Sequence, residues 1–567
     1  MRRAWLVAAV TAAALALPAS AWAHAALLHT VPTASGTVNA APPAVRLTYS
    51  EPIEPRFAIV SVTDATGKQV TSGAPASAPG APQTLVTPLK RVPEGWYLVF
   101  WRVISADGHP VRGAFTFAVG PNPGPPPQFR VPSLSETATT TQLLIGRWAM
   151  FLSLLSALGL FVLRALIARP VLRRVPGCSL RSLNVAFFVA VGVALAAIPV
   201  YVLLATAQFT LRSVWDLGAI VPVARDSDFG RDFLDLEVVF ALFAVAAGIA
   251  LWLDRPDREQ RSVVELIALP SALATGIAAL FLPALAGHAG QKAPRGLSLP
   301  LDVGHLGAVA IWLGGLIGLV VFWLSVGARR RSAALAYVVP RFSVVAFCSV
   351  VLLIGTGIGQ SLEEFPTLAS LWSTSYGVAL LWKIGLLSAA LLLASVNLAR
   401  TKPRLQANDA SAPRLLRRLV TGEIVFVVAA LFAAAVLSSL APPSSALAKV
   451  QNVAARVGPG PVTAVVTKSP YKVHVQVTPN RAAVPNTFQL TLTRNGKPVS
   501  GAQVITKFDM LDMQMGEQSY EFKELSPGVF SKSAPALVMV GHWGLVFEVT
   551  PPKGKPFVVT VLDKAGG

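Results

Sequence analysis

Residues that could bind a metal ion occur in three parts of this sequence, and the first is near the amino terminus. His24 directly follows an Ala-Trp-Ala sequence at 21–23, which two arginines and an apolar run precede. This layout is typical of a secretory signal peptide that is cleaved after Ala23, so His24 is expected to begin the mature chain. The free α-amine and the imidazole of that residue are both nitrogen donors suited to Cu(II) or Ni(II).

A carboxylate and a second imidazole lie further along the same soluble region, in Asp107-Gly108-His109. Two side chains separated by one residue can project to one side, and the glycine permits a tight backbone. With His24 they would supply an amine, two imidazoles and a carboxylate, a set of N and O ligands that suits tetragonal Cu(II). Taken alone, an Asp-x-His pair near a turn is usually solvated and binds no metal.

The second group lies in long apolar stretches, where an ionisable side chain is costly and marks a functional candidate. Most members fall in the outer third of their stretch, and they are the functional candidates of this part: Arg147, His288, Asp302, His305 and Lys383. Glu423 is the exception, in the inner part of the last stretch. The alternative is that long or amphipathic side chains reach the membrane interface and have no role in transport.

The third group lies near the carboxyl terminus, where Met513 and Met515 fall on one side of an extended segment and His542 follows. Thioethers favour Cu(I), so these three residues form a candidate Cu(I) site. Methionines also fill hydrophobic cores, and packing remains the competing interpretation.

The elements that must position these residues differ in composition along the 567-residue chain, which is 53% hydrophobic and only 13% charged. Its middle part contains eight apolar stretches, each long enough to cross a bilayer as a helix. Both cysteines lie in this part, so the flanking regions have no disulfide and no thiolate site. The expected spans are 141–167, 183–207, 234–253, 262–286, 301–327, 338–360, 376–397 and 416–440.

Arginine and lysine cluster in the loops that follow the first, third, fifth and seventh spans. By the positive-inside rule these loops are cytoplasmic, so both mature termini are expected on the outer, periplasmic side of the inner membrane. The net charge of +20 is then mainly a signature of topology, and no nucleic-acid partner is expected.

Both flanking regions predict small β-sandwiches, because short runs rich in β-branched and aromatic residues alternate with turn residues. Expected strands are 45–50, 57–64, 95–105 and 112–119 in the first region, and 473–479, 487–499, 544–550 and 557–563 in the last. Asn495-Gly496 is a hairpin signal. The predicted organisation is a signal peptide (1–23), a β-sandwich (24–120), a linker (121–140), an eight-span membrane domain (141–440), a linker (441–459) and an immunoglobulin-like β-sandwich (460–567).

Each part resembles a known family. "HAALLHTVPTASGTVNAAPPAVRLTYSEPIEP" and "GWYLVFWRVISADGHPVRGAFTFAVG" resemble the CopC family of periplasmic copper proteins, and the resemblance implies that His24, Asp107 and His109 bind Cu(II). "GHAGQKAPRGLSLPLDVGHLGAVAIWLGGL" and "WKIGLLSAALLLASVN" resemble the CopD family of inner-membrane copper proteins. This resemblance implies a transmembrane copper path along Arg147, His288, Asp302, His305 and Lys383. The last region resembles the YtkA-like domain found in similar fusions.

We therefore predict a copper-binding membrane protein that captures Cu(II) outside and mediates copper transport, in the direction of import. Its expected partners are copper ions, the bilayer and periplasmic copper chaperones. The alternative is a protein that sequesters copper without net transport. An enzyme is not expected: no GxxxxGK[ST] loop is present, and haem ligation by His288 and His305 is the remaining enzymatic alternative.

Overall fold

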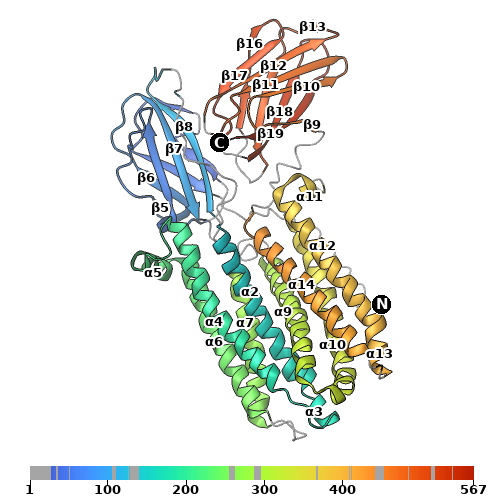
Figure 1. Ribbon diagram of the computed structural model, residues 1–567. Coiled ribbons are helices and arrows are strands. Elements are labelled where there is room, and N and C mark those ends of the chain that lie inside the picture. The colour runs from blue at the N-terminus through green and yellow to red at the C-terminus, as the bar shows by residue number, and fades with distance from the viewer. Residues whose placement is uncertain are drawn as a thin grey trace, which may run out of the picture.

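The computed structural model places two β domains at the same end of a block of helices (Figure 1). It describes residues 27–33, 36–49, 52–104, 110–124, 127, 140–254, 262–286, 295–365, 368, 370–407, 409, 411–440, 453–482, 484–511, 518–538 and 541–566. The predicted fold class is confirmed: a β-sandwich, eight long apolar helices and a second β domain follow one another along the chain.

The N-terminal domain packs two four-stranded sheets face to face, in the orders β1-β3-β6-β5 and β2-β8-β7-β4. Alternating side chains enter the core between the sheets, where Tyr97, Trp101 and Phe117 are buried. The strands are β1 (Leu27–Val31), β2 (Thr37–Val38), β3 (Ala44–Tyr49), β4 (Ile59–Asp64), β5 (Ala76–Ala78), β6 (Ala81–Pro88), β7 (Gly95–Ile104) and β8 (Pro110–Val119).

Eight helical spans form the central block within the described residues. In helix order they comprise α2 (Thr141–Val162), α4 (Arg181–Thr210), α6 (Asp228–Leu253), α7 (Val263–Ala286), α9 (Arg295–Ser325), α10 (Ala328–Glu364), α12 (Ser375–Val396) and α14 (Ala412–Leu437). Shorter helices are α3 (Val171–Arg174), α5 (Leu217–Asp226), α11 (Ser370–Ser373) and α13 (Lys402–Gln406). Two π-helical segments, η2 (Leu163–Ala168) and η3 (Asn397–Thr401), continue α2 and α12.

The first and fifth spans lie in the interior of this block. Their most apolar windows are 78% and 61% buried, whereas those of the other six spans are 17–33% buried and leave most of their surface to lipid. The α2 and α9 backbones meet at Gly159 and Gly314, where a Cβ on Gly159 would lie 1.8 Å from the carbonyl oxygen of Ala310. Small residues permit such close helix packing in membranes.

The C-terminal domain has sheets in the orders β10-β11-β12-β17-β16 and β15-β14-β18-β19-β9. The predicted Asn495-Gly496 hairpin is confirmed: Arg494 pairs with Lys497, and both turn residues have positive φ. The strands are β9 (Val453–Val457), β10 (Val462–Lys468), β11 (Tyr471–Thr478), β12 (Asn486–Arg494), β13 (Lys497–Pro498), β14 (Gln503–Met510), β15 (Gln518–Glu521), β16 (Lys523–Ser526), β17 (Val529–Ala534), β18 (Gly541–Thr550) and β19 (Phe557–Ala565).

The N-terminal domain contacts the end of α4 through hydrogen bonds and an aromatic pair. The Arg102 guanidinium donates from Nη1 to the carbonyl oxygen of Phe209 at 2.6 Å and from Nη2 to that of Gln208 at 3.0 Å. These carbonyls belong to the last turn of α4, which carries partial negative charge and attracts a cation. The rings of Phe57 and Phe209 also pack edge to face, with centroids 5.4 Å apart.

One buried carboxyl group, that of Asp563, should make the C-terminal domain less stable at neutral than at acidic pH. Burial raises the pKa of Asp563 from 3.8 to about 6, although hydrogen bonds and His542 act in the opposite direction. Asp563 Oδ1 accepts from Asn480 Nδ2 at 2.9 Å, whereas Asp563 Oδ2 and Asn480 Oδ1, both acceptors, have no partner among the described residues. When Asp563 is protonated, its carboxyl group carries an O–H group. This group is a hydrogen-bond donor, which the two unpaired oxygens otherwise lack.

Because the folded domain holds this proton more tightly than the unfolded chain, its free energy of unfolding should fall by about 2 kcal/mol as pH rises from 4 to 7. An Asp563→Asn variant, which keeps a donor at every pH, should lack this loss. Hydrogen exchange in β19, compared between the two proteins at each pH, measures the difference. Equal pH dependence in both would contradict the assignment.

Candidate copper sites

The predicted Cu(II) ligands His24, Asp107 and His109 lie outside the described residues, but the strands around two of them are described. Segment 105–109 joins the end of β7 to the start of β8. Ile104, the last residue of β7, is buried in the same apolar cluster as the helices of the block. In the sequence, Asp107 and His109 come three and five residues after Ile104, which contacts the helical block. His29 is exposed, as expected of a surface histidine.

In the helical block the structure brings together side chains from α9 and α10. Asp302 and His305 lie one turn apart on α9, and Thr356 and Gln360 lie one turn apart on α10. Gln360 Nε2 donates to Asp302 Oδ1 at 3.1 Å, and His305 Nδ1 lies 3.0 Å from Thr356 Oγ1. We call these four residues, together with Lys383, the outer polar cluster.

The hydrogen bonds of Thr356 assign the tautomer of His305. The Thr356 hydroxyl donates its single proton to the carbonyl oxygen of Leu352, at 2.7 Å. Toward His305 the hydroxyl can therefore only accept, so the proton of the neutral imidazole is on Nδ1. Nε2 then carries the free lone pair, which is the arrangement that metal-binding histidines adopt when a neighbour orients the ring.

Lys383 of α12 is the third predicted residue of this group. Its ammonium group interacts electrostatically with the Asp302 carboxylate and with the His305 ring. A copper ion held by Asp302 and His305 would meet this positive charge. The geometry thus suits a site that binds copper transiently, because the lysine competes for the same carboxylate.

Arg147 has different neighbours. Its Nε donates to the Tyr201 hydroxyl at 3.2 Å, and its Nη1 donates to Ser438 Oγ at 2.9 Å and Ser439 Oγ at 3.1 Å. These bonds join α2 to α4 and to the end of α14, and they give Arg147 a role in helix packing. His288, the remaining residue of the predicted path, lies outside the described residues.

The candidate Cu(I) site of the C-terminal domain is described only in part. Met513 and Met515 lie outside the described residues, whereas His542 lies on β18 and is partly buried. The backbone amide of Leu511 donates to the carbonyl oxygen of His542 at 2.8 Å. His542 is therefore adjacent to the residue from which the methionine-bearing segment departs.

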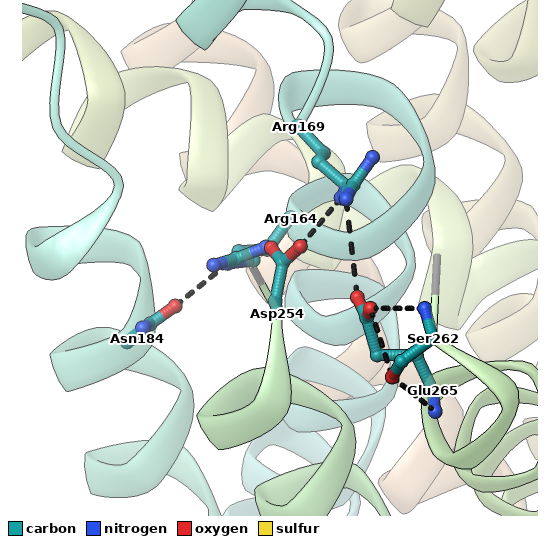
Figure 2. Close-up of polar contacts among 6 residues, drawn as sticks. All are labelled: Arg164, Arg169, Asn184, Asp254, Ser262 and Glu265. Carbon is teal, nitrogen blue, oxygen red and sulfur yellow. Dashed lines mark hydrogen bonds and ion pairs between the residues drawn. The ribbon is translucent and has the colours of Figure 1, made fainter. Parts of the chain in front are cut away.

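At the end of the block opposite the β domains, two arginines and two acids form a buried network (Figure 2). Asp254 pairs with Arg164 through Oδ2 and with Arg169 through Oδ1, and Arg169 Nη2 lies 3.8 Å from Glu265 Oε1. Arg164 Nε also donates to Asn184 Oδ1 at 2.8 Å. The network joins the first four spans, and its charges sum to zero.

Sequence reasoning missed this network and the contribution of α10. Arg169 belongs to the basic stretch after the first span, whose charge the positive-inside rule already explains, and it also pairs with the buried acids Asp254 and Glu265. The spacing of Thr356 and Gln360 could have predicted a polar face on the sixth span, because residues four apart lie on the same face of a helix. Within the part of the chain that the structure describes, no group of three or more His, Cys, Asp or Glu side chains has metal-binding geometry.

Each of the three parts of the chain matches a known protein family. Residues 27–120 match the CopC domain family, 336–437 match the family described as copper resistance protein D, and 466–546 match the YtkA-like family. The copper transport protein CutJ of Bacillus subtilis (strain 168) is 26% identical over 549 residues, which are 93% of either chain. Copper resistance protein C of Escherichia coli is 38% identical over 107 residues, 18% of this chain and 84% of that protein.

Among solved structures, CopC from Methylosinus trichosporium OB3b is 32% identical and covers 18% of this chain and 99% of its own, with a TM-score of 0.17. The eight apolar helices and these matches define a multi-pass membrane protein with domains of copper-related families. Its regions similar to the CopC, CopD and YtkA-like families follow one another in that order along the chain.

Proposed function

We propose that this protein captures Cu(II) outside the cytoplasmic membrane and passes copper inward through its helical block. His24, Asp107 and His109 hold Cu(II) in the N-terminal domain, and Asp302 and His305 receive copper in the block, with His288 as a further ligand. The proposed C-terminal Cu(I) site consists of Met513, Met515 and His542. Both mature termini face the outside, where periplasmic chaperones can deliver copper.

The observation that carries this proposal is that the end of β7, which precedes Asp107 and His109 in the sequence, is attached to the block. Arg102 and Ile104 at the end of β7 contact the helices, and segment 105–109 follows at once. A carrier fixed in this way delivers its ion over a short distance and in a fixed orientation. A protein that only sequestered copper would gain nothing from this attachment.

Sequestration without transport is the second candidate, favoured by the tight N,O ligand set and by relatives described as copper resistance proteins. It leaves unexplained why ionisable residues occupy the outer polar cluster inside a membrane, where they are costly. We propose no enzymatic activity and no nucleic-acid partner for the chain.

A His305→Ala variant should lower the initial rate of copper uptake by more than about tenfold in cells grown with scarce copper, because it removes the Nε2 ligand. Accumulated copper, measured by mass spectrometry in cells with equal amounts of protein in the membrane, gives the rate. His474→Ala, which removes a histidine from β11 in the C-terminal domain, is the matched control and should leave uptake unchanged.

The same variant separates the two candidate functions. Transport predicts that uptake falls while Cu(II) binding by the N-terminal domain of the full chain stays at the wild-type level. If His305→Ala cells kept wild-type uptake but lost tolerance to high copper, import would be wrong and sequestration would replace it.

A further inference from the structure

A second polar cluster lies in the inner half of the block and has no place in the copper path described above. Glu423 is on α14, and its side chain is only 2% exposed. It occupies the buried stripe of that helix, in register with Leu416, Val420 and Val427. A carboxyl group therefore lies among aliphatic side chains on the face of α14 that packs into the bundle.

The neighbouring helix changes its geometry where it meets this carboxyl group. α12 becomes π-helical over Asn397–Thr401, and Asn397 Nδ2 donates to Glu423 Oε1 at 3.2 Å. A single π turn inside a helical span is rare and often marks a functional site. Here it sets the side chain of Asn397 against the acid.

Two buried oxygens of this π turn have no hydrogen-bond donor among the described residues, Asn397 Oδ1 and Thr401 Oγ1. Thr401 is fully buried, and four residues along a π-helix it lies on nearly the same face as Asn397. Such unpaired acceptors are costly in a membrane interior. A protonated Glu423 carries an O–H group, the kind of donor that they lack.

Copper is a poor occupant of this cluster, because carboxylate, amide and hydroxyl oxygens do not suit Cu(I), and the cluster offers no imidazole or amine nitrogen of the kind that Cu(II) sites use. Two or three oxygens are also too few for a hard metal ion, which takes about six. The remaining way to neutralise a buried carboxylate without an ionic partner is a proton.

The charged groups of the surrounding elements leave Glu423 without such a partner. No ion pair to it is recorded in the described residues, and its recorded side-chain partner is Asn397. The charged residues of the elements that pack against α14 lie toward the outer end of the block (Arg147, Asp302, His305, Glu364, Lys383) or the inner end (Arg329, Arg330, Arg331, Arg400, Lys402, Arg404). Arg341 of α10 is exposed and stacks on Tyr337. Arg417 of α14 itself stacks on Trp323.

We propose that Glu423 is a proton-binding site and that its protonation and deprotonation accompany copper passage through the block. The carboxylate takes up a proton from water, becomes a neutral acid, and returns the proton when the ion moves, so that copper transport is coupled to proton movement. α12 links the two clusters mechanically, because it carries Lys383 of the outer polar cluster and continues into the π turn at Asn397.

The coupling rests on the proposed transport function, and the test separates the two. Infrared spectra of the purified full chain in lipid should show the carbonyl band of a protonated carboxylic acid that titrates with pH. Glu423→Gln, a neutral isostere, should remove that band. Glu237→Gln, which alters a partly buried carboxyl of α6, is the matched control and should leave the Glu423 band in place.

Proteoliposomes containing a pH-sensitive dye then test the coupling. The wild-type protein should move protons when copper is added, and Glu423→Gln should lose at least about tenfold of this proton signal while still binding copper. If the wild-type protein takes up copper and Glu423→Gln matches its proton signal, the proton site is wrong. If the wild-type protein takes up no copper, transport fails, whereas an infrared band lost in Glu423→Gln would still support the proton site.

Discussion

A single glycine inserted between Ala23 and His24 should weaken Cu(II) binding by the purified full chain by more than about 100-fold. Loss of a group that merely orients a ligand already costs about 10–100-fold in metal affinity, and the insertion removes a ligand. After cleavage the α-amine would belong to glycine, and the imidazole of the histidine could no longer chelate with its own amine. Competition against a chromophoric chelator measures the affinity, and mass spectrometry verifies the new amino terminus.

His29→Ala serves as the control for this experiment, because that residue is exposed on β1 and close to the terminus in sequence. It should bind Cu(II) as the wild-type protein does. Asp107→Asn, which removes the charged ligand but keeps the size of the side chain, should fall between the two. Should the glycine-extended protein bind Cu(II) with unchanged affinity, the amino-terminal ligand would have to be abandoned.

Local patterns explain which parts of the fold could be predicted from sequence. The eight spans follow from hydropathy alone, since a bilayer requires a minimum apolar length. The predicted strand 95–105 coincides with β7 to within one residue because its aromatic and β-branched residues fit a buried sheet. Strand β6 was missed: its Ala-Pro-Gln-Thr start has weak strand character, and its pairing with β3 supplies the stabilisation.

The sites show the same division between local and distant information. Asp302 and His305 could be grouped because they lie one turn apart on one helix. Their contacts with Thr356, Gln360 and Lys383 depend on how three helices pack, which periodicity does not encode. The sixth span also begins earlier than predicted, at Ala328, because its arginines extend α10 beyond the apolar stretch. Charges that obey the positive-inside rule can therefore be helical as well.

Asp254→Asn should destabilise the helical block by about 3–5 kcal/mol, because it leaves two buried guanidiniums with one distant carboxylate. Asp254 is 4% exposed at its side chain, and it is the only acid within ion-pair distance of Arg164 in the described residues. The loss in free energy of unfolding is measured on the purified full chain in mixed micelles that contain increasing amounts of a denaturing detergent. Asp216→Asn breaks the exposed pair of Asp216 with Arg212 and should cost less than about 1 kcal/mol.

The double variant Arg164→Met with Asp254→Asn tests why Asp254→Asn destabilises the block. The cause is either the unpaired charge that it leaves or the packing and hydrogen bonds that it removes. It removes one charge of each sign and leaves Arg169 facing Glu265, so the network is neutral again. If unpaired charge dominates, the double variant should be more stable than Asp254→Asn alone, although it carries one more substitution. A double variant less stable than either single one would mean that the four side chains act through packing and hydrogen bonds, and that the ionic account of this end of the block is wrong.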